Sequence, residues 1–468
     1  MRLAQARVHF IGIGGIGMCG LAELLRNMGG QVSGSDLSEN ANTARLKAMG
    51  VEIALGHAAA NIADAEVVVY SSAVKADNPE FREARRLKIP LIPRAEALAE
   101  MMRLKRGVAV GGSHGKTTTT SLTASIFMHA KAQPTIVVGG RLDLIKSTAL
   151  LGQGEWLIAE ADESDGSFSR LSPEMVIVTN IDNDHLDYYG TVAQLKKAFF
   201  DFAMRTPFYG LAIVCGDDPA VRDTFEDFGK RILFYGFNAE NDLRLSGSKG
   251  AYDVFQGDQK LGSFTLGLPG RHNALNACAA LAVGLEAGFP FSVCAEGLES
   301  FRGVDRRFQL KGAVKGADGN ADSIEIYDDY GHHPTEVSAV LNAFREKYPD
   351  RRVVTVFQPH RYSRTHLVWD EFVECFGEAD KVFICDIYAA GEDPIKGVSG
   401  ERLSTEVAIS KNAPKAVEHL PNSVDRLAKI KSELRDGDVL VTLGAGDIWK
   451  LGMQVLEAMG GTPVASKG

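Results

Sequence analysis

The segment VAVGGSHGKTTTT, from Val108 to Thr120, contains the residues best suited to bind a nucleoside triphosphate. In a loop between a strand and a helix, backbone N–H groups can surround phosphates, Lys116 can reach the β- and γ-phosphates, and the Thr117 hydroxyl can hold Mg²⁺. Strict P-loop spacing would need a glycine where Val110 stands, so this is not a standard P-loop. We nevertheless expect an ATP site rather than a solvated lysine in a turn. Its residues would be Gly112, Ser113, His114, Gly115, Lys116, Thr117 and Thr118.

Two acidic clusters follow this loop, each after a β-rich run. The first contains Glu160, Asp162, Glu163 and Asp165, and the second contains Asp182, Asp184, His185 and Asp187. Open α/β sheets bind ligands beyond the carboxyl ends of their strands, and Mg²⁺ prefers oxygen ligands. A single acid could simply cap a helix, but two clusters downstream of one phosphate loop favour a metal site beside the triphosphate.

A second glycine loop lies near the amino terminus. Gly12, Gly14, Gly15 and Gly17 satisfy the pattern G-x-G-x-x-G between a predicted strand and a predicted helix. Glycines let the backbone approach a diphosphate, and the helix N-terminus carries a partial positive charge. Asp36 ends the next predicted strand, where a ribose-binding acid would stand. The loop alone leaves open a ligand-free turn, a bound NAD, or the diphosphate of another nucleotide such as a UDP-sugar.

Composition excludes several classes of protein. The formal net charge of −9 argues against a broad nucleic-acid surface. Six scattered cysteines without a C-x-x-C pair argue against a disulfide framework or a cysteine zinc site. No apolar run approaches the ~18 residues that a membrane helix needs, and the amino terminus lacks the apolar region of a signal peptide. We therefore expect a cytoplasmic protein without membrane insertion, either a monomer or a homodimer.

The order of predicted strands and helices indicates three α/β domains in series. Residues 1–105 should form a Rossmann-like domain, residues 106–305 a P-loop-type ATPase domain, and residues 306–468 a second Rossmann-like domain. A polar, glycine-rich stretch from Phe237 to Gly267 predicts a small antiparallel insertion in the second domain.

Nine motifs occur in one order along nearly the whole chain: GIGGIGM, GSHGKTTTT, EADESD, NIDNDHLD, LPGRHNALNA, DRRF, DDYGHHPTE, QPHRYSRT and YAAGE. Together they resemble the Mur ligases of peptidoglycan synthesis. The resemblance implies three domains that bind a UDP-sugar, ATP and an amino acid. DDYGHHPTE and QPHRYSRT are similar to the branch of the family in which ATP, with Mg²⁺, phosphorylates the carboxylate of UDP-N-acetylmuramate and the amine of L-alanine captures the acyl phosphate.

The resemblance also assigns roles to residues inside these motifs. It implies a metal site formed by Thr117, Glu160 and His185. It implies further contacts with ATP from His272, Asn273, Asn276, Arg307 and Asp329. It implies contacts with the amino acid and the acyl phosphate from Tyr330, His332, Arg361 and Arg364. The UDP-sugar is expected at Gly12, Gly14, Gly15, Gly17, Asp36, Ser71 and Ser72. The catalytic set would be Lys116, Glu160, His185, His332, Arg361 and Arg364.

Some positions depart from the usual pattern of the family. Ser113 replaces a commoner threonine, and Cys19 replaces a commoner serine. Asp305 replaces a commoner glycine, and this acid leaves the role of the nearby Arg307 open. Three alternatives compete with this interpretation: an NAD-dependent oxidoreductase, a related ligase that attaches a whole tripeptide to the same sugar, and a non-catalytic nucleotide-binding scaffold. The tripeptide enzyme tends to have tyrosine where Ser164 stands, which favours use of the single amino acid.

Overall fold

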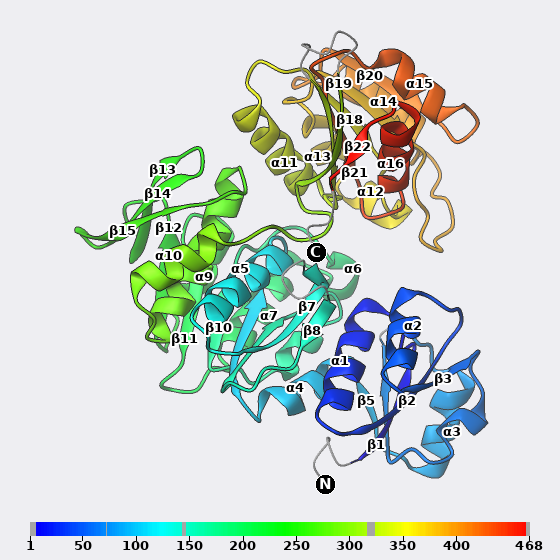
Figure 1. The fold of residues 1–468 in the computed structure, drawn as a ribbon, viewed down its shortest axis with the longest axis vertical. Coiled ribbons are helices and arrows are strands. Elements are labelled where there is room, and N and C mark those ends of the chain that lie inside the picture. The colour runs from blue at the N-terminus through cyan, green and yellow to red at the C-terminus, as the bar shows by residue number, and fades with distance from the viewer. Residues whose placement is uncertain (1–5, 72, 143–146, 316–322, 465–468) are drawn as a thin grey trace. The chain divides into compact units, whose positions relative to one another are not determined.

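The computed structural model describes residues 6–71, 73–142, 147–315 and 323–464 (Figure 1). It divides into two compact units. The first contains Met1–Gly267 and Asn273–Val304, and the second contains Leu268–His272 and Asp305–Gly468. The first unit thus contains the earlier part of the chain and the second unit the part after Val304. The exception is the short segment Leu268–His272, which belongs to the second unit.

The first sheet is parallel and has five strands among the described residues, in the order β3-β2-β1-β4-β5. Its strands are β1 (Arg7–Ile11), β2 (Gln31–Asp36), β3 (Glu52–Leu55), β4 (Val67–Tyr70) and β5 (Leu91–Pro93). Its helices are α1 (Ile16–Asn27), α2 (Ala41–Ala48), α3 (Pro79–Leu87) and α4 (Arg94–Met102), with the 3-10 turn η2 (Ala59–Ile62). Strand–helix alternation and the parallel sheet agree with the Rossmann-like prediction.

The central sheet has ten strands in the described part of the chain, in the order β15-β14-β13-β12-β11-β10-β6-β9-β7-β8. They are β6 (Arg106–Gly111), β7 (Thr135–Leu142), β8 (Ser147–Leu150), β9 (Trp156–Glu160), β10 (Met175–Val178), β11 (Leu211–Cys215), β12 (Ile232–Gly236), β13 (Leu243–Ser248), β14 (Ala251–Gln256) and β15 (Gln259–Thr265). The last three form the antiparallel insertion expected between Phe237 and Gly267.

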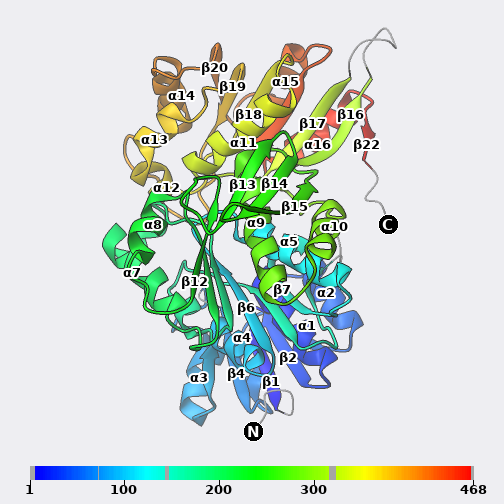
Figure 2. The ribbon, with the colours of Figure 1, turned by 90° about the vertical axis from the view of Figure 1, so that its left-hand side faces the viewer.

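Helices cover this central sheet. They are α5 (Lys116–His129), α6 (Leu186–Tyr189), α7 (Val192–Ala203), α8 (Pro219–Phe225), α9 (Arg271–Glu286) and α10 (Phe291–Glu299), with the 3-10 turn η3 (Ser167–Arg170). α5 packs closely against α10 (Figure 2) because glycine permits a near approach: a Cβ on Gly297 would lie only 2.7 Å from the Ile126 Cα. The strands that carry the acidic clusters, β9 and β10, are almost wholly buried and apolar, as parallel central strands require.

The sheet of the second unit has seven strands within the described ranges, in the order β20-β19-β18-β21-β17-β16-β22. They are β16 (Gln309–Val314), β17 (Ile324–Asp329), β18 (Val353–Phe357), β19 (Lys381–Cys385), β20 (Ala416–Leu420), β21 (Val439–Leu443) and β22 (Thr462–Pro463). The helices are α11 (Pro334–Lys347), α12 (Tyr362–Leu367), α13 (Trp369–Glu374), α14 (Gly400–Ala408), α15 (Arg426–Glu433) and α16 (Trp449–Ala458). Five neighbouring strands pair in parallel, and β16 and β22 add an antiparallel edge.

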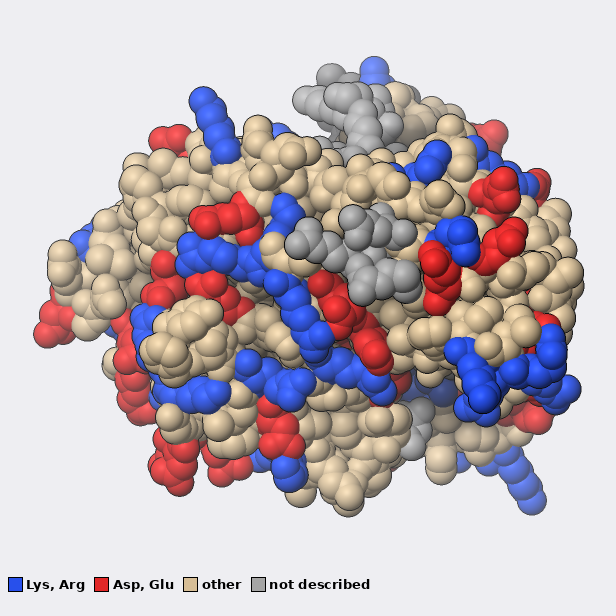
Figure 3. Space-filling view, turned by 90° about the horizontal axis from the view of Figure 1, so that it is seen from below, with Lys and Arg blue, Asp and Glu red and all other residues tan. Residues whose placement is uncertain are grey.

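The state of the cysteines and the distribution of surface charge can be compared with the expectations from composition. All six cysteines are free thiols, in agreement with the expected lack of a disulfide framework, and all six are buried. Acidic and basic side chains are interspersed over the face shown in Figure 3. Among the described residues, no helix combines the length and apolarity needed to cross a bilayer.

Candidate functional site

The predicted phosphate loop connects β6 to α5, and its glycines are required by the backbone. Gly112 has φ +133°, and a Cβ there would lie 1.9 Å from the Thr179 Oγ1. Gly115, the residue before α5, has φ +81°, and a Cβ there would lie 2.7 Å from the Asn276 Oδ1. Neither position can hold another residue without strain. The structure therefore brings Asn276 against the phosphate loop.

The end of β10 holds the phosphate loop from the side. Thr179 donates its hydroxyl to the His114 carbonyl at 2.6 Å, and the Asn180 Oδ1 accepts the His114 N–H at 2.8 Å. The imidazole Nε2 of His114 lies 2.8 Å from the Asp182 Oδ2. Ser113 Oγ accepts the Asp182 N–H at 2.9 Å, so the serine performs a positioning task that a threonine could also perform. Sequence reasoning missed Thr179 and Asn180, although the run MVIVTN places both at a strand end.

Lys116 begins α5 and is enclosed by acceptors. Its ammonium donates to the Gly112 and Ser113 carbonyls at 2.6 and 3.0 Å and to the Glu163 Oε1 at 2.8 Å. Burial lowers the pKa of Lys116, but the surrounding carboxylates, Glu163 first, raise it above its ordinary value. Burial raises the pKa of Glu163 to about 7 against the opposing effect of the ammonium. Lys116 is thus a fixed cation that donates to three oxygens, and a phosphate oxygen can accept from the same ammonium.

Thr117 and Glu160, two of the three predicted metal ligands, lie together. The Thr117 hydroxyl donates to the Glu160 carboxylate at 3.0 and 3.2 Å, and the Gly139 N–H donates to the same carboxylate at 2.8 Å. A hydroxyl and a carboxylate are hard oxygen donors and fit Mg²⁺. His185, in the left-handed region at φ +59°, has its Nε2 3.5 Å from the Glu163 Oε1 instead. The third predicted ligand therefore lies beside the partner of Lys116.

The N-terminal glycine loop is organised by Asp36. Its carboxylate accepts the Gly14 N–H at 2.8 Å, and a Cβ on Gly14 would lie within 2.9 Å of Asp36, Asn40 and Thr43. Here the acid predicted to bind a ribose holds the loop in shape. Ser71 follows β4 and accepts the Ala73 N–H at 3.3 Å, whereas Ser72 lies outside the described residues.

The predicted ATP contacts of the second unit surround the end of β17. Asp329, nearly fully buried, accepts the Phe308 and Gly331 N–H groups at 2.7 Å each, and burial raises its pKa to about 6 against the lowering effect of Arg307. Arg307 lies over the Tyr330 ring with its Nη1 3.7 Å from the Glu336 Oε1. His272 belongs to this unit, and burial, with a smaller effect from Arg307, lowers its pKa to about 4. His272 is therefore a neutral imidazole.

Asp305 and the two arginines that follow it have different ion-pair partners. Asp305 lies 3.8 Å from the Lys311 ammonium rather than on the arginines. Arg306, with φ +59°, turns to the buried Asp328 at 2.9 Å and donates to the Gly444 carbonyl at 2.6 Å. Arg306 is consequently structural, and Arg307 remains the arginine suited to a ligand.

The two arginines of QPHRYSRT and His332 form a second cluster in this unit. The His332 ring lies 6.1 Å from the His360 ring, and the His360 Nδ1 lies 3.4 Å from the Arg364 Nη1. Arg361 has φ +68°, and its Nε donates to the Glu392 carboxylate at 2.5 Å. The structure thus brings His332, Arg361 and Arg364 together, with His360 between them.

Sequence reasoning missed His360 and Glu392, although both lie in quoted motifs. Burial and the neighbouring arginines lower the pKa of His360 to about 4, and its ring stacks on Tyr388 at 5.5 Å. Glu392 also accepts the Ser363 N–H and hydroxyl at 2.9 and 2.7 Å. The contacts of its carboxylate with Ser363 and Arg361 outweigh burial and lower its pKa to about 2. Glu392 is therefore always ionised in the neutral range.

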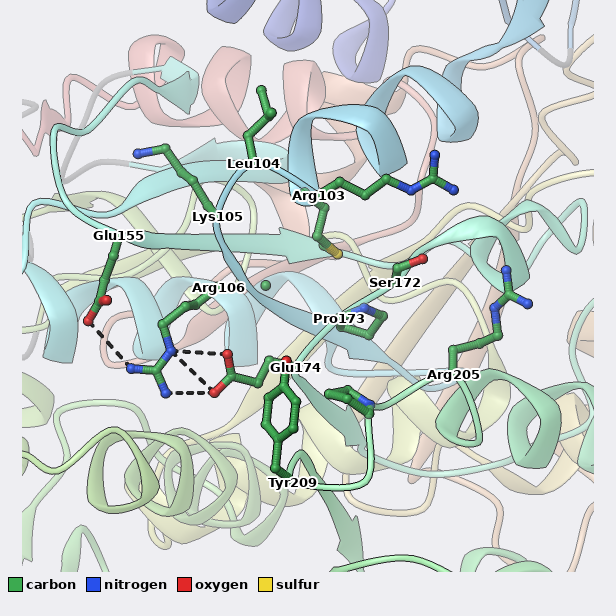
Figure 4. Close-up of a pocket in the computed structure, with 13 residues that line it drawn as sticks. Arg103, Leu104, Lys105, Arg106, Glu155, Ser172, Pro173, Glu174, Arg205 and Tyr209 are labelled. Atoms are coloured by element: carbon green, nitrogen blue, oxygen red, sulfur yellow. Dashed lines mark hydrogen bonds and ion pairs between the residues drawn. The ribbon is translucent and has the colours of Figure 1, made fainter.

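A cavity of about 530 Å³ lies at the opposite, amino-terminal end of the central strands (Figure 4). Arg106, which begins β6, is neutralised there by Glu174 at 2.6 Å and by Glu155 at 3.4 Å. The Lys105 ammonium donates to the Gly152 carbonyl. None of the predicted site residues lines this cavity.

The chain has three sheets flanked by helices. It carries a phosphate-binding type of loop with Lys116 and Thr117, and an arginine pair, Arg361 and Arg364. These features are those of an enzyme of the ATP-dependent ligase class. Three domain families match in series: "Mur ligase family, catalytic domain" at residues 7–106, "Mur ligase middle domain" at 110–284, and "Mur ligase, glutamate ligase domain" at 306–446. The chain therefore belongs to the Mur ligase family, which confirms the family and the fold class expected from the motifs.

Individual members of the family are similar to this chain over nearly its whole length. UDP-N-acetylmuramate–L-alanine ligase of Bdellovibrio bacteriovorus is 58% identical over 98% of this chain and 100% of the relative. The ligase of the same name from Trichlorobacter lovleyi is 48% identical over 97% and 99%. The crystal structure of UDP-N-acetylmuramate–alanine ligase from Thermotoga maritima superposes with a TM-score of 0.78 at 29% identity, covering 97% of this chain and 99% of that one.

Proposed function

We propose that this chain joins L-alanine to UDP-N-acetylmuramate and converts ATP to ADP and phosphate. The observation that carries the proposal is near-complete coverage by relatives of that name at up to 58% identity. The Lys116 environment supports it, because a buried cation at the head of a glycine loop suits a triphosphate. In this proposal residues 1–105 bind the nucleotide sugar, residues 106–305 bind ATP, and residues 306–468 bind the amino acid.

The chemistry requires an activated acid. A free carboxylate is a poor electrophile, whereas its mixed anhydride with phosphate is a good one. Lys116 would hold the β- and γ-phosphates while the muramyl carboxylate attacks the γ-phosphorus and ADP leaves. Thr117 and Glu160 would hold Mg²⁺, which neutralises charge on the phosphates when bound, and His185 is proposed at a second position near it.

Amide formation then needs an oriented amine. The amine of L-alanine attacks the acyl phosphate, and the tetrahedral intermediate expels phosphate. Arg361 and Arg364 are suited to this step because guanidinium groups fork onto carboxylates and phosphates. Holding the amine beside the anhydride makes its attack effectively unimolecular, which accelerates the step. His332, near both arginines through His360, is proposed to help bind the same groups.

Product analysis tests this proposal. The purified chain is incubated with UDP-N-acetylmuramate, ATP and Mg²⁺, together with L-alanine, glycine, L-serine or the tripeptide that a recycling ligase would use. We expect one ADP per new amide, with L-alanine as the preferred acceptor. Exclusive use of the tripeptide would establish the recycling activity instead, and absence of both ADP and a new amide would refute the proposal.

A further inference from the structure

Arg94 lies at the carboxyl end of the first sheet, where the N-terminal glycine loop also lies. It is the first residue of α4 and follows β5 directly, while the glycine loop follows β1. The strands β1, β4 and β5 are parallel neighbours, so the segments that follow them emerge at the same edge. Sequence reasoning gave Arg94 no role.

The stem of Arg94 crosses the last glycine of that loop. A Cβ on Gly17 would lie 3.1 Å from the Arg94 Cδ and 3.2 Å from its Nη1. Gly17 is the second residue of α1, where backbone N–H groups point out of the helix without helical partners. The guanidinium therefore lies beside the N-terminus of α1, where a diphosphate is bound in folds of this kind.

The same guanidinium also reaches the acidic segment that follows β9 of the central sheet. Its Nη2 donates to the Asp162 Oδ2 at 3.2 Å. Asp162 follows β9 and is two residues from Glu160, and its carboxylate also interacts with the Lys116 charge. Arg94 thus lies against the N-terminal glycine loop and pairs with the acidic segment that follows β9, both within the first unit.

The ion pair between Arg94 and Asp162 contributes too little stability to explain why Arg94 lies at this position. The Arg94 side chain is 22% exposed and that of Asp162 is 43% exposed, and partly exposed pairs contribute about 0–1 kcal/mol. In the described part of the chain Arg94 makes one hydrogen bond, although a guanidinium has several donors. A second pair, Arg170 with Glu96 at 2.7 Å, already connects α4 to η3, which follows Asp162 in the chain.

We infer that Arg94 binds the diphosphate of the nucleotide sugar and exchanges Asp162 for it. This inference rests on the proposed function, because it assumes a nucleotide sugar on the Gly12–Gly17 loop. A phosphate is a stronger partner than a single carboxylate oxygen, since a guanidinium can donate to it with two N–H groups. Binding of the sugar nucleotide would then free the Asp162 carboxylate beside Lys116, so that occupation of one loop alters the charge at the other.

The test measures affinity by calorimetry for UDP, UDP-N-acetylglucosamine and UDP-N-acetylmuramate, with ADP as the reference ligand. Arg94→Ala should weaken all three uridine nucleotides by about 10- to 100-fold and change the affinity for ADP far less. Arg94→Lys should recover part of the loss. Arg170→Ala, which breaks the neighbouring ion pair, is the matched control and should bind all four ligands like the wild type.

Asp162→Asn separates a ligand-binding arginine from a structural ion pair. If Arg94 acted only by holding Asp162, this variant would lose uridine-nucleotide affinity as Arg94→Ala does; we expect wild-type or tighter binding instead. A loss in Arg94→Ala confined to UDP-N-acetylmuramate would place the guanidinium on the muramyl carboxylate and overturn the diphosphate assignment, as would no loss at all. Failure of the wild type to bind any uridine nucleotide would overturn the proposed function as well.

Discussion

Replacing Glu392 by glutamine removes one charge from the arginine cluster of the second unit while keeping the shape of the side chain. Glu392 accepts from Arg361 Nε and from the N–H and hydroxyl of Ser363. Arg361 has φ +68°, a backbone conformation that costs about 1–2 kcal/mol in a residue other than glycine and persists only when its surroundings enforce it. The carboxylate is the group best placed to enforce it.

The size of the effect follows from the pKa of Glu392. A fall from 4.5 to about 2 corresponds to roughly 3 kcal/mol of preference for the charged form. The Glu392 side chain is 22% exposed and that of Arg361 is 34% exposed. Solvent screening therefore reduces the energy that the charged carboxylate contributes to about 1–2 kcal/mol. Because this pKa is depressed, the contribution is complete above pH 4.5 and is lost only as the pH falls through about 2. Activity assays near neutral pH therefore cannot protonate Glu392, and the substitution must take the place of protonation.

Steady-state kinetics measure the consequence. Glu392→Gln should lower kcat/KM for L-alanine roughly ten-fold, which corresponds to about 1.4 kcal/mol, and leave KM for ATP unchanged. Glu406→Gln is the matched control, because Glu406 also accepts from an arginine Nε, that of Arg402, at 2.7 Å, and its pKa is also lowered. Wild-type alanine kinetics in Glu392→Gln, or an equal loss in both variants, would refute a positioning role for Glu392.

Three further substitutions test other parts of the molecule. Lys116→Ala should abolish ADP release while circular dichroism shows an intact fold; normal ADP formation would contradict the ATP assignment. Gly115→Ala should weaken ADP binding in calorimetry, because its φ of +81° costs about 1–2 kcal/mol and the new Cβ meets Asn276; unchanged affinity would show that the loop adapts. Glu80→Gln should lower the thermal stability at pH 7, because the buried carboxylate accepts from Ser35 and Asn61 at 2.6 Å each. Together with the buried His9, these contacts lower the pKa of Glu80 despite burial, so the deficit should shrink as the pH falls below 4.5, and a deficit independent of pH would be inconsistent with this cause.

The elements and loops of this chain could be predicted because their signals are local. The Gly112–Thr117 loop lies between a β-branched strand and a helix, and each step is visible within a few residues of sequence. The same holds for the antiparallel insertion, where glycine and polar residues alternate with apolar ones. Asp36 ends its strand, as the same local signals predict, and its carboxylate accepts the Gly14 N–H of the glycine loop.

The partners of the site residues could not be predicted, because they come from distant parts of the chain. Glu163 is 47 residues from Lys116, and Asp162 is 68 residues from Arg94. Periodicity and composition carry no information on which acid meets which base when several acids follow one strand. The register of the parallel strands decides which acids lie beside the phosphate loop. β9 and β6 pair so that Glu160 lies opposite Val110, and this pairing brings the first acidic cluster beside the loop.

Backbone conformation decided the roles of two adjacent arginines that the sequence could not distinguish. Arg306 and Arg307 are identical in type, and the acid before them could have paired with either. Both guanidinium groups lie over the Tyr330 ring, but Arg306, with a left-handed backbone that recurs at Phe308 with φ +46°, pairs with the buried Asp328, whereas Arg307 has its Nη1 3.7 Å from the Glu336 Oε1. A guanidinium bound to a buried carboxylate and to a carbonyl at 2.6 Å stabilises the loop and has little capacity for a ligand. The acid at position 305 is then harmless, because the backbone directs it to Lys311 instead.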